Sequence, residues 1–208
     1  MSSCKPEEVV ALLQGIIESS LAYCGYYRSP GRLAHLAREL ALLAGLDAER
    51  AEAVSHATAL CDLGMLGLPH ELLGRDGPLR PAEREIMQQH TIIGQELLAE
   101  VSHPTFQMAA TVAATHHERM DGGGYPNGLK APNITIEARI ASVVSIYVAL
   151  TQPRPFRNVR SAHQAEEILQ GLAGAHLDAG LVKLLLDNQE RLAQPVRVDV
   201  GGGAQLGG

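Results

Sequence analysis

"HHERMDGGGYPNGL", residues 116–129, is the most informative stretch of this chain for fold and function. Two adjacent histidines precede a glutamate, and a glycine-rich turn that carries Tyr125 and Pro126 follows. Imidazole and carboxylate groups are the usual ligands of iron, manganese and zinc. The stretch therefore predicts either part of a metal site with a loop attached, or only the end of a helix. If it is a metal site, its other ligands must come from elsewhere in the chain.

Helical periodicity dominates the sequence on both sides of this stretch. Apolar residues recur at helical spacing over 81–99, 105–118 and 136–151. Helices are also predicted over 6–24, 30–44 and 47–65, from a capping box at 161–164, and from Asp178 to about Leu192. Segment 66–80, rich in Gly and Pro, is predicted to be a loop that allows one short turn of helix, and segment 119–134 is predicted to be a loop. No alternating strand pattern exceeds four residues, so the predicted fold class is all-α.

Composition narrows the function classes. The chain has 208 residues, enough for one core, with 46% hydrophobic and only 3% aromatic residues. A net charge of −6 gives no electrostatic reason to expect a nucleic-acid partner. Three cysteines without a CxxC pair fit a reducing cytoplasm, and no apolar run reaches the ~20 residues of a membrane span. We therefore expect a cytoplasmic protein that binds neither nucleic acid nor membrane.

Two histidines are predicted to point inward. His90 is in register with Ile86, Ile93 and Leu97, and His116 follows Val112 by one turn. A single inward histidine is usually a hydrogen-bonded core residue. Two of them, together with His117 beside an acidic residue, favour a metal site.

Asp62 is the candidate carboxylate. It ends the apolar helix at "ALCDLG", and a buried carboxylate needs a partner. A cation shared with His90 and His116 would supply that partner. Alternatively, Asp62 caps the turn at Gly64. Spacing alone leaves both interpretations open.

At these residues the chain resembles the HD-GYP domains, a branch of the HD phosphohydrolase superfamily. Residues 116–129 are similar to the family's HHExxDGxGYPxGL motif, and residues 59–90 to its HD segment and downstream helix. Residues 138–157 and 176–186 resemble the helix after the loop and the closing segment. The resemblance covers about residues 25–187. It implies an HD-GYP-like helical bundle of about seven helices over 25–192. Apolar periodicity separately predicts an amphipathic helix in segment 1–24, and the glycine-rich end predicts a flexible tail at 193–208.

The resemblance also implies an activity and a set of site residues. The family activity is hydrolysis of cyclic di-GMP, to pGpG or onward to GMP, at a two- or three-metal centre. The metal positions that persist are Asp62, His90, His116 and His117. The loop, here called the GYP loop, is linked in the family to the substrate pocket and to contacts with GGDEF-type diguanylate cyclases. Its motif positions are Asp121, Gly122, Gly124, Tyr125, Pro126 and Gly128. A surface turn kept only for packing is the alternative interpretation of this loop.

Other positions depart from the family pattern. Gly25, Ser29, Cys61 and Ser145 stand where the family has metal ligands, and Met65 stands where it has a lysine. Ser29 would instead cap the helix that begins at Pro30. Cys61 could complete a zinc-like ligand set, or could be a small buried apolar residue. We expect at most one divalent transition metal, iron, manganese or zinc, or none.

These departures favour a regulatory role over catalysis. The first hypothesis is a degenerate, catalytically impaired HD-GYP domain that binds a GGDEF-type cyclase or another signalling protein through the GYP loop, or holds cyclic di-GMP without turnover. The alternative is an active cyclic di-GMP phosphodiesterase with a reduced metal site. A purely structural helical scaffold is a third class. Asp62 would be the residual catalytic group in the second case.

Overall fold

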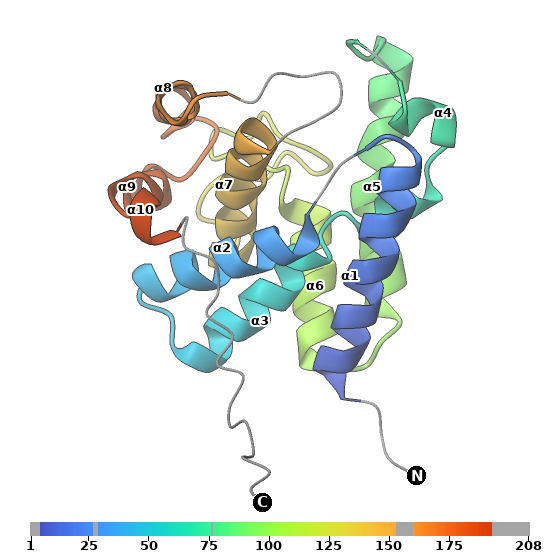
Figure 1. Cartoon of the computed structure of the whole chain (residues 1–208), viewed down its shortest axis with the longest axis horizontal. Helices are drawn as coiled ribbons and strands as arrows, with labels where there is room; N and C mark the ends of the chain where they lie inside the picture. The colour runs from blue at the N-terminus through green and yellow to red at the C-terminus, as the bar shows by residue number, and fades with distance from the viewer. Residues whose placement is uncertain (1–4, 27–28, 76, 153–159, 193–208) are drawn as a thin grey trace, which may run out of the picture.

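The computed structural model describes residues 5–26, 29–75, 77–152 and 160–192 (Figure 1). Within these ranges the chain is helical and forms no strand; Asp121–Lys130 and Ala173–Leu177 are isolated bridges. The predicted all-α class is therefore confirmed. The α-helices are α1 (Pro6–Tyr23), α2 (Pro30–Leu43), α3 (Ala48–Ala59), α4 (His70–Leu73), α5 (Pro81–Ala99), α6 (Pro104–Thr115), α7 (Ile136–Thr151), α8 (Ala162–Leu172), α9 (Ala179–Asp187) and α10 (Gln189–Leu192), and a 3₁₀ helix, η1 (Leu63–Gly67), lies between α3 and α4.

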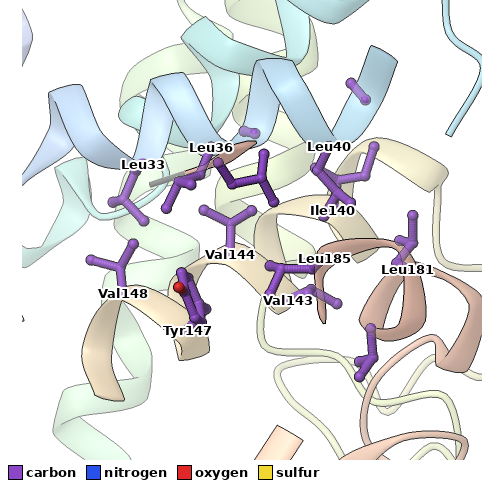
Figure 2. Close-up of a cluster of buried hydrophobic side chains, with 14 of the residues drawn as sticks. Leu33, Leu36, Leu40, Ile140, Val143, Val144, Tyr147, Val148, Leu181 and Leu185 are labelled. Carbon is purple, nitrogen blue, oxygen red and sulfur yellow. The ribbon is translucent and has the colours of Figure 1, made fainter. Parts of the chain in front are cut away.

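Two hydrophobic clusters hold the helices together. In the first, Leu33, Leu36 and Leu40 of α2 face α7 and α9, and Val144 and Tyr147 of α7 lie opposite them (Figure 2). The second cluster joins α1, η1, α5 and α6, and α3 and α7 also contribute to it. Aliphatic and alanine side chains make up most of both, as the low aromatic content predicts. No helix among the described residues is long and apolar enough to cross a membrane.

Local signals place most helix ends correctly. Helices α1, α2, α5 and α6 begin with proline, whose missing N–H is not needed in the first turn. The predicted capping box is present, because the Ser161 hydroxyl accepts a 3.2 Å hydrogen bond from the Gln164 amide. Asp178 caps α9 by accepting from Gly180 and Leu181. Helices α5 and α7 have the predicted bounds. The predicted flexible tail, 193–208, lies outside the described residues.

Three predicted helices differ from the observed ones by more than one residue. The helix expected over 47–65 ends at Ala59, and the chain turns into η1. At this turn Gly64 approaches α5 so closely that a Cβ would lie 1.9 Å from the His90 carbonyl oxygen. The helix expected to reach residue 118 ends at Thr115, and the last helix is interrupted at Asn188. The end at Ala59 is set by the contact of Gly64 with α5, and helical periodicity carries no information about such tertiary contacts.

The apolar stripes are only partly buried. On α1, Leu12 and Ile16 are 64% and 42% exposed, whereas Ile17 and Leu21 are buried. On α5, the buried face consists of His90, Thr91, Gly94 and Leu98. Two residues predicted to share the face of His90, Ile86 and Leu97, are instead 43% and 52% exposed. The prediction of an inward His90 was correct, but the register used to reach it was wrong.

Candidate metal centre

Four side chains from three parts of the chain converge at one place. Asp62 directly precedes η1, His90 lies in the middle of α5, and His116 and His117 follow the last residue of α6. Each offers a ligand atom, and these four atoms all lie within 4.8 Å of one another. Asp62, His90 and His116 are buried, and His117 is partly exposed. The expected convergence of Asp62, His90 and His116 is confirmed.

The helices fix the orientation of two imidazoles. Nδ1 of His90 lies 2.7 Å from the Met87 carbonyl oxygen, and Nδ1 of His116 lies 3.1 and 3.0 Å from those of Val112 and Ala113. A carbonyl oxygen only accepts hydrogen bonds, so Nδ1 carries the proton in both rings. In the neutral ring this leaves the lone pair on Nε2, and each Nε2 lies 3.8 Å from Oδ1 of Asp62. This is the tautomer that binds a metal through Nε2.

The environment of Asp62 decides between its two interpretations. Asp62 occupies the N-cap position of η1, but its side chain makes no capping hydrogen bond there. Its carboxylate is 2% exposed and faces the two Nε2 atoms. Burial of a carboxylate is costly without a compensating cation or donors. The ligand interpretation therefore fits the structure, and the capping interpretation does not.

The GYP loop packs directly on the ligand group. The Tyr125 ring stacks on the His117 imidazole with a centroid distance of 4.7 Å and an interplanar angle of 21°. The Tyr125 amide donates to the His117 carbonyl oxygen at 3.2 Å. A Cβ on Gly124 would lie 2.5 Å from the Glu118 Cα, so only glycine allows this approach. The loop is thus part of the wall of the site.

Glu118 is a site residue that sequence reasoning counted only as the acidic neighbour of His117, without a structural role of its own. Its carboxylate is buried, with the residue 2% exposed, and accepts from the Asn127 amide at 2.7 Å and the Leu129 amide at 2.9 Å. These two bonds join the start of the GYP loop to its end. Only its place in the motif, directly after the histidine pair, distinguishes this glutamate in the sequence.

Asp121 holds the exposed side of the same loop. Its carboxylate accepts from the Arg119 guanidinium and, at 2.8 Å, from the Gly123 amide. The hydrogen bond from Arg119 is the main reason why the pKa of Asp121 falls to about 2. Gly122 and Gly128 have φ values of 83° and 64°, which favour glycine.

The structure places each of the altered family positions. Gly25 is exposed, follows α1 and has a φ of 77°. Ser29 is the N-cap residue of α2, but its side chain makes no capping hydrogen bond. The hydroxyl of Ser145 is buried and has no hydrogen-bond partner among the described residues.

Cys61 and Met65 both lie in the second hydrophobic cluster. Met65 is 2% exposed and lines a cavity of about 410 Å³ together with Leu21, Cys24 and Leu73. Cys61 is buried and is not one of the four residues whose ligand atoms converge. Its role as an extra zinc ligand stays a prediction.

Comparison with known proteins identifies the family. Residues 12–181 match the family model described as "HD domain", and the chain belongs to that family. Within it, the GYP loop and the relatives below place the chain among the HD-GYP domains.

The relatives are named as cyclic dinucleotide phosphodiesterases. The chain is 33% identical to a cyclic di-GMP phosphodiesterase of Thermotoga maritima, over 82% of this chain and 46% of that protein. It is 34% identical to the cyclic di-GMP phosphodiesterase response regulator RpfG of Xanthomonas campestris, over 85% and 48%. It is 36% identical to 3'3'-cGAMP-specific phosphodiesterase 2 of Vibrio cholerae, over 76% and 30%. The chain spans less than half the length of these curated relatives.

Solved structures support the fold. A cyclic GMP-AMP-specific phosphodiesterase of V. cholerae, V-cGAP3, superposes with a TM-score of 0.64 at 15% identity, over 86% of this chain and 50% of that one. Bd1817, an HDG"Y"P protein of Bdellovibrio bacteriovorus, superposes with a TM-score of 0.61 at 18% identity, over 88% and 60%. At such identities these matches concern the fold alone.

Proposed function

We propose that this chain is a degenerate HD-GYP domain that binds one divalent transition metal and acts as a regulatory module. The metal is iron, manganese or zinc, and its ligands are Asp62, His90, His116 and His117. The observation that carries the proposal is the composition of this group, which has three imidazoles and a single carboxylate. When bound, such a cation acts as a Lewis acid and lowers the pKa of a bound water.

Charge argues against two cations in this group. Two divalent ions ~3.7 Å apart repel by roughly 18 kcal/mol at an effective dielectric constant of ~20. One carboxylate, Asp62, offsets only one of their four positive charges. The family positions that would add ligands hold Gly25, Ser29, Cys61 and Ser145. A centre that pairs a hydroxide-generating cation with a phosphate-neutralising one is therefore not expected here.

The lysine position supports the same conclusion. A phosphodiester gains negative charge as it reacts, and a positioned cation stabilises that charge. Loss of one stabilising group of this kind typically costs roughly 10²–10³ in rate. Met65 carries no charge and is buried in the second hydrophobic cluster. It cannot take over this role.

The GYP loop supports a role in protein binding. Asn127 and Gly128 are exposed, and hydrogen bonds to Glu118 and Asp121 hold the loop. A pre-organised loop loses little entropy when it binds a partner. We propose a GGDEF-type diguanylate cyclase or another signalling protein as that partner, with cyclic di-GMP as a ligand held without turnover. Location in the cytoplasm and the division into segments 1–24, 25–192 and 193–208 remain predictions.

A phosphodiesterase with one cation is the second candidate. Two observations favour it: the relatives carry phosphodiesterase names, and the four surviving ligands share one convergent group. Since the relatives are named for cyclic di-GMP or for 3'3'-cGAMP, both nucleotides are relevant substrates for an assay.

A turnover assay separates the two candidates. Purified protein is incubated with either nucleotide and with iron, manganese or zinc, and linear products are quantified. The regulatory proposal predicts no metal-dependent product. Metal-dependent pGpG or GMP that disappears in Asp62→Ala would establish the enzyme instead.

A binding assay tests the role of the loop. Diguanylate cyclases are captured with wild type, with Asn127→Ala in the exposed part of the loop, and with Tyr125→Ala. Gly171→Ala, on α8, is the control outside the loop, because nothing lies within 4 Å of the added methyl group. Weaker capture by the loop variants alone supports the proposal, and capture that no loop change affects contradicts it.

A further inference from the structure

We propose that Glu118 is a positioning residue that holds the GYP loop closed on His117 and thereby couples metal binding to the order of the loop. The inference rests on the proposed metal site. It does not depend on whether the chain hydrolyses a nucleotide.

Glu118 is placed to organise the loop and not to bind the metal. It is not among the four residues whose ligand atoms converge. Its two carboxylate oxygens face the amides of Asn127 and Leu129, nine and eleven residues along the chain. Because the residue is only 2% exposed, water is a poor substitute for either bond. The two bonds close the segment from Glu118 to Leu129 into a ring, and the Asp121–Lys130 bridge joins the same two ends.

The GYP loop contacts one residue of the ligand group, His117, most directly. His90 and His116 have Nδ1 fixed by helix carbonyls, but His117 lies beyond α6 and packs beneath Tyr125. Three contacts of the loop act on the segment that carries His117. The Tyr125 ring stacks on the imidazole, the Tyr125 amide donates a hydrogen bond to the His117 carbonyl oxygen, and Gly124 approaches the backbone closely. The orientation of the His117 ring and the position of the loop therefore depend on each other.

Such mutual dependence has a thermodynamic consequence. If the closed loop favours the metal-binding orientation of His117, then a bound metal must favour the closed loop by the same factor. Outer-shell groups that orient a ligand typically change metal affinity by roughly 10–100-fold. A partner that binds the closed GYP loop would then distinguish metal-loaded from metal-free protein.

Glu118→Gln is the sharpest perturbation. It preserves shape but replaces one acceptor oxygen with an NH₂ group that faces a backbone N–H. Zn²⁺ and Mn²⁺ affinities of the whole chain are measured by calorimetry for wild type, Glu118→Gln, His117→Ala and the double variant. Glu167→Gln is the matched control, because it makes the same exchange at an exposed glutamate of α8, outside the GYP loop.

We expect Glu118→Gln to weaken metal binding by about 10–100-fold, and Glu167→Gln to leave it unchanged. In the His117→Ala background, Glu118→Gln should have no further effect, because the glutamate acts through that imidazole. Co²⁺-loaded Glu118→Gln should show a visible spectrum close to that of His117→Ala. If Glu118→Gln weakened metal binding equally in the His117→Ala background, the substitution would act by general destabilisation, and the proposal would be overturned.

Hydrogen exchange gives a test that needs no substitution. Zn²⁺ binding to wild type should slow exchange at the amides of Asn127 and Leu129, although neither belongs to the ligand group. Exchange at these amides that is unchanged by saturating Zn²⁺, in a chain that calorimetry shows to bind Zn²⁺, would overturn the coupling. A wild-type chain that binds no metal would refute the proposed metal site and this inference together, whereas unchanged exchange in a metal-loaded chain refutes the inference alone.

Discussion

Replacement of Gly64 by alanine should damage both the stability of the fold and the metal site. The new Cβ would lie 1.9 Å from the His90 carbonyl oxygen and 2.5 Å from the Gly94 nitrogen. All of these atoms belong to backbone, so a rotamer change cannot relieve the clash. Helices η1 and α5 would have to separate by about 1.5 Å to reach an ordinary contact distance.

The size of this displacement sets the expected effects. Overpacking of a core typically lowers the free energy of unfolding by ~1–3 kcal/mol. A backbone clash lies at the upper end of this range, so we expect Gly64→Ala to lower it by about 3 kcal/mol. Asp62 directly precedes η1 and His90 lies on α5, so the separation also acts on the ligand group. It exceeds the ~0.2 Å tolerance of metal–ligand distances, and metal affinity should fall sharply.

Urea denaturation and Mn²⁺ titration of Gly64→Ala measure the two effects. Gly15→Ala is the control, because Gly15 lies within α1 and nothing lies within 4 Å of the added methyl group. Alanine is the better helix former, so this control should gain about 0.5–1 kcal/mol. If Gly64→Ala were as stable as wild type and bound Mn²⁺ equally well, the close packing of η1 on α5 would be refuted.

Three further predictions follow from named contacts. Asp62→Asn removes the carboxylate of the ligand group, so Mn²⁺ affinity in calorimetry should fall by more than the roughly 10–100-fold typical of outer-shell partners; unchanged affinity would exclude Asp62 as a ligand. The folded pKa of Asp121, about 2, is below its ordinary 3.8, so its stabilisation is present above pH 3.8 and is lost as pH falls through 2. The stability gap between wild type and Asp121→Asn should therefore close over that window in urea titrations, and a gap that persists below pH 2 would contradict the assignment. Ser145→Asp places a carboxylate at a residue that is 4% exposed, so in the presence of a chelator it should lower the free energy of unfolding by about 3 kcal/mol. Mn²⁺ should restore part of that loss in thermal denaturation, and no recovery with metal would place Ser145 outside the site.

Much of the fold is encoded locally and was predictable. Proline at the first position of α5, the capping box at Ser161 and the cap at Asp178 are short-range signals that stop or start a helix. The four-residue ligand group was predictable for a different reason. Its residues stand in motifs whose family pattern is known, and the structure brings their ligand atoms together.

The features that could not be predicted depend on contacts between distant segments. The turn after Ala59 exists because Gly64 fits against the backbone of α5, and no periodicity reports such a contact. Ile86 and Leu97 are apolar but exposed, so an apolar stripe alone could not locate the buried face of α5. The role of Glu118 depends on amides nine and eleven residues away, in a loop without a regular pattern.

The metal content of the purified chain tests the central claim most directly. Protein prepared without oxygen and without chelator is analysed for iron, manganese and zinc, and each element is expressed per chain. The single carboxylate of the ligand group predicts at most one equivalent in total. Two or more tightly bound equivalents per chain would contradict a reduced, single-cation centre and with it the proposed loss of hydrolysis.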